Sequence, residues 1–198
     1  MKHLSVDWSF KQLPENVISV VDEFLGDSGK MYFAGHVYPT GCYFWPYPNP
    51  IQRDLFPELK NEILVRLRKK LSEERVTVYI GEDLTEQIEP PCIVVAPTTD
   101  QFDILRIEGT CEPKRDIETI DILNFLLVID QQFGIDIMGA TARMIVFKLK
   151  RIPQGIEREK FVQWFIDNTP FDYPWSVGWP VDIEDADLLE PIEFYWED

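Results

Sequence analysis

Apolar residues recur at helical spacing in four stretches of this chain. The clearest stretch has Leu or Ile at every fourth position from 55 to 71. Residues 17–25, 117–133 and 161–166 also show apolar faces, and 120–129 is apolar nearly all round. Because an apolar stripe of this period faces a core when the chain winds into a helix, the four stretches predict helices.

Runs of β-branched and aromatic residues between these stretches predict strands at 4–10, 31–38, 42–47, 76–80, 92–96, 135–138, 144–149 and 192–196. Cys92–Ala96 is apolar throughout, which is typical of a strand buried on both faces. Near the C-terminus, Ile192, Phe194 and Trp196 alternate with polar neighbours. This period of two predicts that one side of the last strand packs against the core, near the 120–129 helix.

The predicted elements follow the order strand, helix, strand, strand, helix, strand. This order predicts an α+β fold with a ferredoxin-like βαββαβ order in the second half, repeated in the first half. Pro90-Pro91 marks the expected seam between residues 1–90 and residues 91–198. One continuous domain with an extended sheet is the alternative.

The second half also resembles a bacterial family catalogued as domain of unknown function 4253. Three motifs carry the resemblance: Pro97–Leu105 (PTTDQFDIL), Phe133–Ala140 (FGIDIMGA) and the terminal Phe194–Asp198 (FYWED). The family commonly has Cys-Pro-Asp and then Asp-Gln-Gly before its last helix, whereas residues 168–175 here read NTPFDYPW. The resemblance covers about half of the chain, implies a bacterial origin and a shared fold, and indicates no activity.

Charge and cysteine content narrow the classes of function. The chain has 35 acidic and 19 basic residues, a net charge of −16, which disfavours nucleic acid and anionic membranes as partners. Its three cysteines form no CxxC motif, which favours a reducing, cytoplasmic location. We expect no secretory signal and no membrane span, since the longest apolar run is short and is interrupted by Asn124.

Two groups of residues could carry chemistry. Asp100, Asp103 and Glu108 follow the buried strand, where paired carboxylates could transfer protons or bind a divalent cation. The structural alternative, which we favour, is that acids in the first turn of a helix complement its dipole. His36 and Cys42 could form an activated nucleophile or half of a zinc site, or equally a buried thiol beside a hydrogen-bonded imidazole. No motif for a cofactor is present, and we expect none to be bound.

The last 38 residues, 161–198, contain ten acidic residues and no Lys or Arg. Acids are mixed with tryptophans there, which suggests a surface for a basic partner, with these candidate residues: Trp175, Trp179, Asp182, Asp185 and Asp187. The aromatic residues could also be lids over the core, the alternative that we favour for them. Basic residues lie instead along the Leu-rich helix, where a solvated helix flank is the simplest interpretation: Lys60, Arg66, Arg68, Lys69 and Lys70.

These observations lead to two hypotheses of function. The first is an acidic cytoplasmic protein-binding module, of the inhibitor or immunity type, that engages a basic protein. The second is an enzyme or small-ligand-binding protein whose site contains Asp100, Asp103 and Glu108, with His36 as a further candidate.

Overall fold

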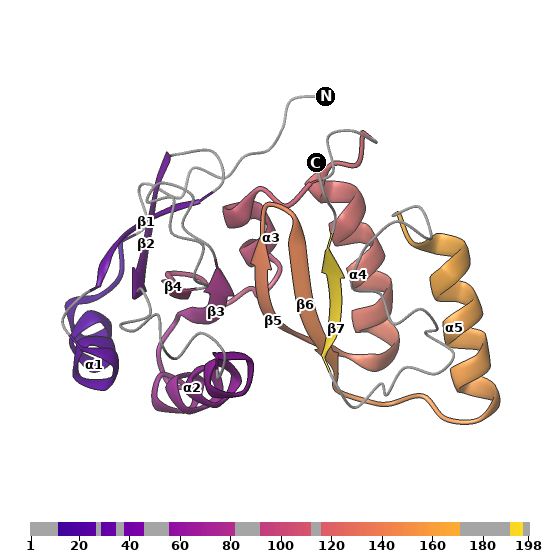
Figure 1. Ribbon diagram of the computed structural model, residues 1–198, viewed down its shortest axis with the longest axis horizontal. Coiled ribbons are helices and arrows are strands. Elements are labelled where there is room, and N and C mark those ends of the chain that lie inside the picture. The colour runs from indigo at the N-terminus through magenta and orange to yellow at the C-terminus, as the bar shows by residue number, and fades with distance from the viewer. Residues whose placement is uncertain are drawn as a thin grey trace. The chain divides into compact units, whose positions relative to one another are not determined.

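The computed structural model describes residues 12–26, 29–34, 38–45, 56–81, 92–111, 116–170 and 191–195. Both helices and strands occur in them, which confirms the predicted α+β class. The chain divides into two compact units, Met1–Gly109 and Thr110–Asp198 (Figure 1). The strand predicted at 4–10 lies outside the described residues.

The described part of the first unit contains three helices and four strands. The helices are α1 (Glu15–Leu25), α2 (Phe56–Lys70) and α3 (Asp103–Glu108). The strands are β1 (Lys30–Ala34), β2 (Tyr38–Trp45), β3 (Thr77–Gly81) and β4 (Cys92–Ala96).

These four strands lie in the order β1-β2-β4-β3, and each neighbouring pair is antiparallel. Because β4 is antiparallel to both β2 and β3, those two strands run parallel to each other with β4 between them and α2 as their connection. This is a split βαβ arrangement. All five residues of β4 are buried, as its apolar sequence predicts.

The position of β4 changes the division of the chain that the sequence suggested. Both edges of β4 are paired within the first unit, so it cannot also pair with strands of the second half. The predicted ferredoxin-like order of the second half is therefore not confirmed. For the same reason, the compact units divide after Gly109 rather than at the predicted seam, Pro90-Pro91, which lies outside the described residues.

The start of β2 contains residues that resemble a turn in the sequence. Pro39-Thr40-Gly41 has the composition of a hairpin turn, yet these residues belong to β2. The register shifts between Met31↔Tyr43 and Phe33↔Pro39, so β2 carries extra residues there. Gly41 has a φ of 72°, a backbone conformation that glycine adopts without a steric cost. A β-bulge thus explains a glycine that resembles a turn signal in the sequence.

The two longer helices of the first unit lie side by side (Figure 1). Val17 and Val21 of α1 and Leu64 and Leu67 of α2 are fully buried. Trp45 of β2 is buried too, and its Nε1 donates a hydrogen bond of 2.9 Å to an Asp22 carboxylate oxygen. The predicted apolar face of α2 is thus confirmed at Leu67, whereas Leu64, rather than Ile63, is the neighbour that is fully buried.

The described part of the second unit contains α4 (Thr119–Phe133), β5 (Ile135–Thr141), β6 (Met144–Leu149), α5 (Ile156–Asn168) and β7 (Ile192–Tyr195). The strands lie in the order β5-β6-β7 and pair antiparallel. Figure 1 shows α4 and α5 on the same side of these strands. On β6, Ile145, Phe147 and Leu149 are buried, while their neighbours are half-buried, so one face of the strand is in the core.

Aromatic rings join the helices of the second unit to its last strand. Phe194 of β7 lies 6.2 Å from Phe125 of α4 and 5.6 Å from Phe165 of α5, measured between ring centroids. Ile192 and Phe194 are buried, and Glu193 between them is exposed. This confirms the alternation predicted for the last strand and its packing against the helix at 120–129. Trp196, the third member of the predicted face, lies outside the described residues.

Helix α4 has a defined start and a defined end. Glu118 is its N-cap and forms a reciprocal capping box with Asp121. Asp116, which precedes it, has a positive φ of 55°. Gly134 ends the helix, with a φ of 67°. Ile120 is 51% exposed, so the helix is not buried all round, although six of its residues are buried.

Candidate functional site

The candidate site is the segment that leads from β4 into α3. Two backbone contacts fix its start: the Thr98 N–H donates to the Ala96 carbonyl at 2.8 Å, and the Thr77 hydroxyl donates to the Thr98 carbonyl at 2.7 Å. Thr77 is the first residue of β3. The segment is therefore attached to two neighbouring strands before α3 begins.

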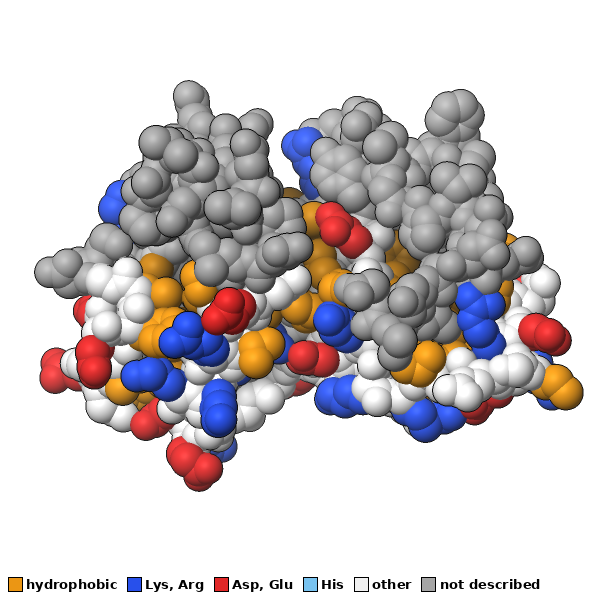
Figure 2. Space-filling view, turned by 60° about the horizontal axis from the view of Figure 1, so that its bottom comes forward, with side chains coloured by type: hydrophobic (Ala, Val, Ile, Leu, Met, Phe, Trp, Pro, Cys, Tyr) orange, Lys and Arg blue, Asp and Glu red, His pale blue; other side chains and the backbone are white. Residues whose placement is uncertain are grey.

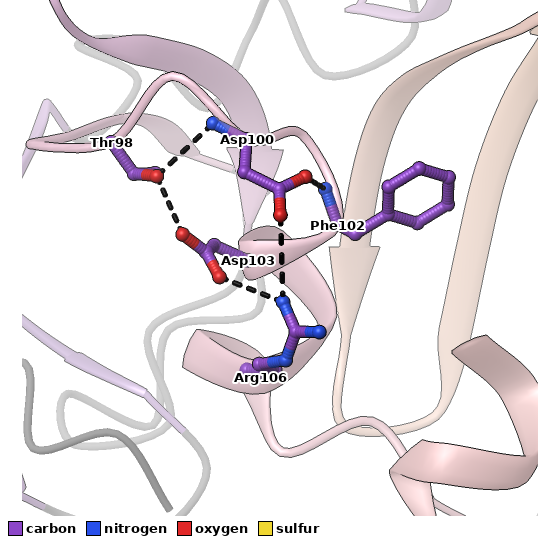
Figure 3. A network of polar contacts seen from close by, with 5 residues as sticks. All are labelled: Thr98, Asp100, Phe102, Asp103 and Arg106. Carbon is purple, nitrogen blue, oxygen red and sulfur yellow. Dashed lines mark hydrogen bonds and ion pairs between the residues drawn. The ribbon is translucent and has the colours of Figure 1, made fainter. Parts of the chain in front are cut away.

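The Thr98 hydroxyl organises the turn that follows (Figure 3). It accepts a hydrogen bond of 3.1 Å from the Asp100 N–H and donates one of 2.5 Å to Asp103 Oδ2. Asp100 Oδ1 in turn accepts a hydrogen bond of 2.9 Å from the Phe102 N–H. These contacts satisfy backbone donors ahead of α3, a role that Thr and Asp side chains commonly have at helix starts.

One guanidinium group forms ion pairs with both carboxylates. Arg106 Nη1 lies 2.8 Å from Asp103 Oδ1 and 3.7 Å from Asp100 Oδ2. The Asp103 side chain is only 15% exposed, and each of its two oxygens already has a partner, Thr98 or Arg106. This carboxylate is therefore engaged in the structure of the turn rather than presented to a substrate or a metal ion.

Glu108 is not part of this group. It is the last residue of α3, whereas Asp103 is the first. Its side chain is buried, with 1% exposure, and its Oε1 accepts a hydrogen bond of 2.6 Å from the hydroxyl of Tyr79 on β3, which is also fully buried. The structure thus brings Asp100 and Asp103 together and places Glu108 in a separate buried contact.

The structure describes only some of the other residues that could take part in catalysis or bind a metal ion. Cys42 is fully buried on β2, and His36 lies outside the described residues, so the proposed Cys–His pair is not observed. Cys42, Cys92 and Cys111 are thiols, not disulfides. Within the described ranges, no group of three or more His, Cys, Asp or Glu side chains could hold a metal ion.

Part of the acidic, tryptophan-containing segment lies in the described second unit. Asp167 on α5 and Glu193 on β7 are both exposed. Trp164 stacks on Phe125 with 5.5 Å between ring centroids, so this tryptophan packs against α4. The five candidate partner-binding residues lie outside the described residues: Trp175, Trp179, Asp182, Asp185 and Asp187.

The basic residues along α2 do not form a patch of a single sign. Arg66 and Lys70 each lie 5.5 Å from the centroid of the Phe24 ring, and Arg66 pairs with Glu62 at 3.3 Å. Arg68 donates a hydrogen bond to the carbonyl of Val78. Figure 2 shows Lys and Arg side chains interspersed with Asp and Glu over the described surface. This mixture is typical of a solvated helix flank.

Sequence reasoning missed two residues of this region. Arg106 follows Asp103 at the i,i+3 spacing of a helical ion pair, so its role could have been read from the sequence. Tyr79 contacts Glu108 across 29 positions, and no local pattern indicates such a contact.

Comparisons with protein-family models, with curated proteins and with solved structures gave no match, so the resemblance to domain of unknown function 4253 stays a prediction. Among the described helices, none is both long enough and apolar enough to cross a bilayer.

Proposed function

We propose that this protein is a non-enzymatic, cytoplasmic binding module that uses its acidic C-terminal residues to engage a basic surface of another protein. The observation that carries the proposal is the charge of residues 161–198: ten carboxylates with no Lys or Arg. Such a segment accounts for most of the net charge of −16. Charge of one sign accelerates encounter with a partner of the opposite sign and disfavours partners of the same sign.

The described members of this segment are consistent with such a role. Glu193 alternates with the buried Ile192 and Phe194. Strand β7 is therefore packed against the core through these two residues, while the Glu193 carboxylate is exposed. Asp167 is exposed on the last turns of α5, where it accepts a hydrogen bond from Gln163. The folded elements therefore provide a rigid support from which acidic side chains can reach a partner.

The carboxylates of the alternative hypothesis have structural partners. Asp103 is bonded to Thr98 and Arg106, and Asp100 accepts a hydrogen bond from the backbone of Phe102. Glu108 is buried against Tyr79. Since a catalytic or metal-binding group needs access to its ligand, these contacts favour a binding module over an enzyme with this site.

The proposal is tested by affinity capture from the native cytoplasm at low and high salt. The acidic variant replaces Asp182, Asp185 and Asp187 with Asn. A control variant replaces Glu23, Glu62 and Glu73, which are exposed in the first unit, with Gln, so the net charge changes equally.

We expect a basic protein to be captured at low salt, released at high salt and lost only with the acidic variant, because salt screens exposed charges beyond about 10 Å at 0.1 M. Capture of nothing at either salt, or equal loss with both variants, would contradict the proposal.

The enzyme or ligand-binding alternative has its own test. A thermal-shift screen with divalent cations and common metabolites is applied to the protein and to the Asp100→Asn, Asp103→Asn double variant. A melting temperature raised by a ligand in the protein, but not in the double variant, would favour the alternative. Destabilisation of the variant without any ligand-dependent shift is the result expected from the contacts described above.

A further inference from the structure

We draw no further inference here: the strongest candidate, the outer face of α2 on which Arg66 and Lys70 lie over the Phe24 ring, is balanced by Glu62, and nothing in the structure shows what would cover it.

Discussion

At the scale of single residues, Tyr79 and Glu108 form a buried polar contact between β3 and the end of α3. Both side chains are buried, and the 2.6 Å distance between the phenol oxygen and the carboxyl oxygen is in the range of charge-assisted O–H···O⁻ bonds. A carboxyl group taken out of water requires donors inside the protein. The contact thus attaches the end of α3 to β3 through a buried polar bond.

Replacement of Tyr79 by Phe should destabilise the protein by about 1–3 kcal/mol, because the buried carboxyl of Glu108 loses one of its donors. The measurement is the midpoint of denaturant unfolding. Tyr43→Phe is the matched control, since Tyr43 is only half-buried on β2, with its ring tilted by 37° against that of Trp45 at 6.4 Å between centroids. Equal midpoints for the two variants would show that the Tyr79 hydroxyl contributes no more to stability than the Tyr43 hydroxyl.

Arg151 makes a second instructive set of contacts, this time at the surface. Its guanidinium lies 4.6 Å from the Phe133 ring centroid, donates to the Gln132 carbonyl at 2.9 Å and pairs with Glu157 at 2.7 Å. The hydrogen bond from Arg151 lowers the pKa of Glu157 below its ordinary value of 4.5, and the same bond raises the pKa of Arg151. One exposed side chain therefore connects the end of α4 with the start of α5.

Replacement of Arg151 by Gln should raise the pKa of Glu157 back toward its ordinary value, which NMR titration of the carboxyl carbon would measure. Since the folded-state pKa is lowered, the pair stabilises the protein above pH 4.5 and loses this effect as pH falls through the lower value. Lys160→Gln is the control, because it removes a cation from α5 and leaves the Arg151–Glu157 bond in place. A Glu157 titration that is unchanged in Arg151→Gln would contradict the ion pair.

At the scale of elements, the start of α3 shows how a short helix is fixed by side chains. The helix has only six residues, too few to be stable by its own backbone bonds. Thr98 reaches both the backbone ahead of the helix and the carboxylate of Asp103, and Arg106 closes the group from the last turn. The acidic character of this segment follows from the requirements of the helix start.

Replacement of Thr98 by Val should cost about 0.5–1.5 kcal/mol, the usual contribution of a hydrogen bond, because the Thr98 hydroxyl bonds both the Asp100 N–H and the Asp103 carboxylate. The adjacent Thr99→Val is a close control, since Thr99 is exposed and Thr98 is buried. Hydrogen exchange of the Asp100 amide would report the effect locally, because that amide donates to the Thr98 hydroxyl. Faster exchange of the Asp100 amide in Thr99→Val than in Thr98→Val would contradict the hydrogen bond to the Thr98 hydroxyl.

Most elements could be predicted from the sequence, because each of them depends on a local period. The apolar run Cys92–Ala96, the face of α1 and the alternation around Phe194 all have one correct local interpretation. Gly41 allows two local interpretations, since a bulge and a turn both use glycine at positive φ. Which strands pair with β4 was beyond local patterns, because a strand buried on both faces looks the same in any sheet.

The candidate site was predictable to a similar extent. Asp100 and Asp103 are close in sequence and are indeed brought together, while Glu108 was grouped with them by proximity along the chain alone. The five positions from Asp103 to Glu108 place the two side chains at opposite ends of a short helix. Proximity in sequence therefore did not predict proximity in space, because the helix places Asp103 and Glu108 at its opposite ends.

At the scale of the whole molecule, the stability of the second unit depends on its last strand. Phe194 is 1% exposed and contacts rings from α4, β6 and α5: Phe125, Phe147 and Phe165. Four aromatic rings from four elements thus form the centre of this unit.

Replacement of Phe194 by Ala should destabilise the protein by about 3–5 kcal/mol, the usual range for a large aromatic side chain removed from a core. Glu193→Ala, one position away on the exposed side of β7, should change the unfolding free energy by less than about 0.5 kcal/mol. Denaturant unfolding of the two variants makes the comparison. Similar midpoints would mean that β7 adds little to the core, and the acidic C-terminal residues would then lack a rigid support.

The place of β4 between β2 and β3 also has a consequence for the order in which the protein can fold during synthesis. The ribosome produces β2, α2 and β3 before β4, yet β2 and β3 are joined within the sheet only through β4. A nascent chain that ends before Cys92 therefore has α1, β1, β2, α2 and β3 without the strand that joins β2 to β3. Such a chain exposes strand edges and apolar surface, which favours association with chaperones. Emergence of residues 92–96 from the ribosome is thus the step at which β2 and β3 can be joined.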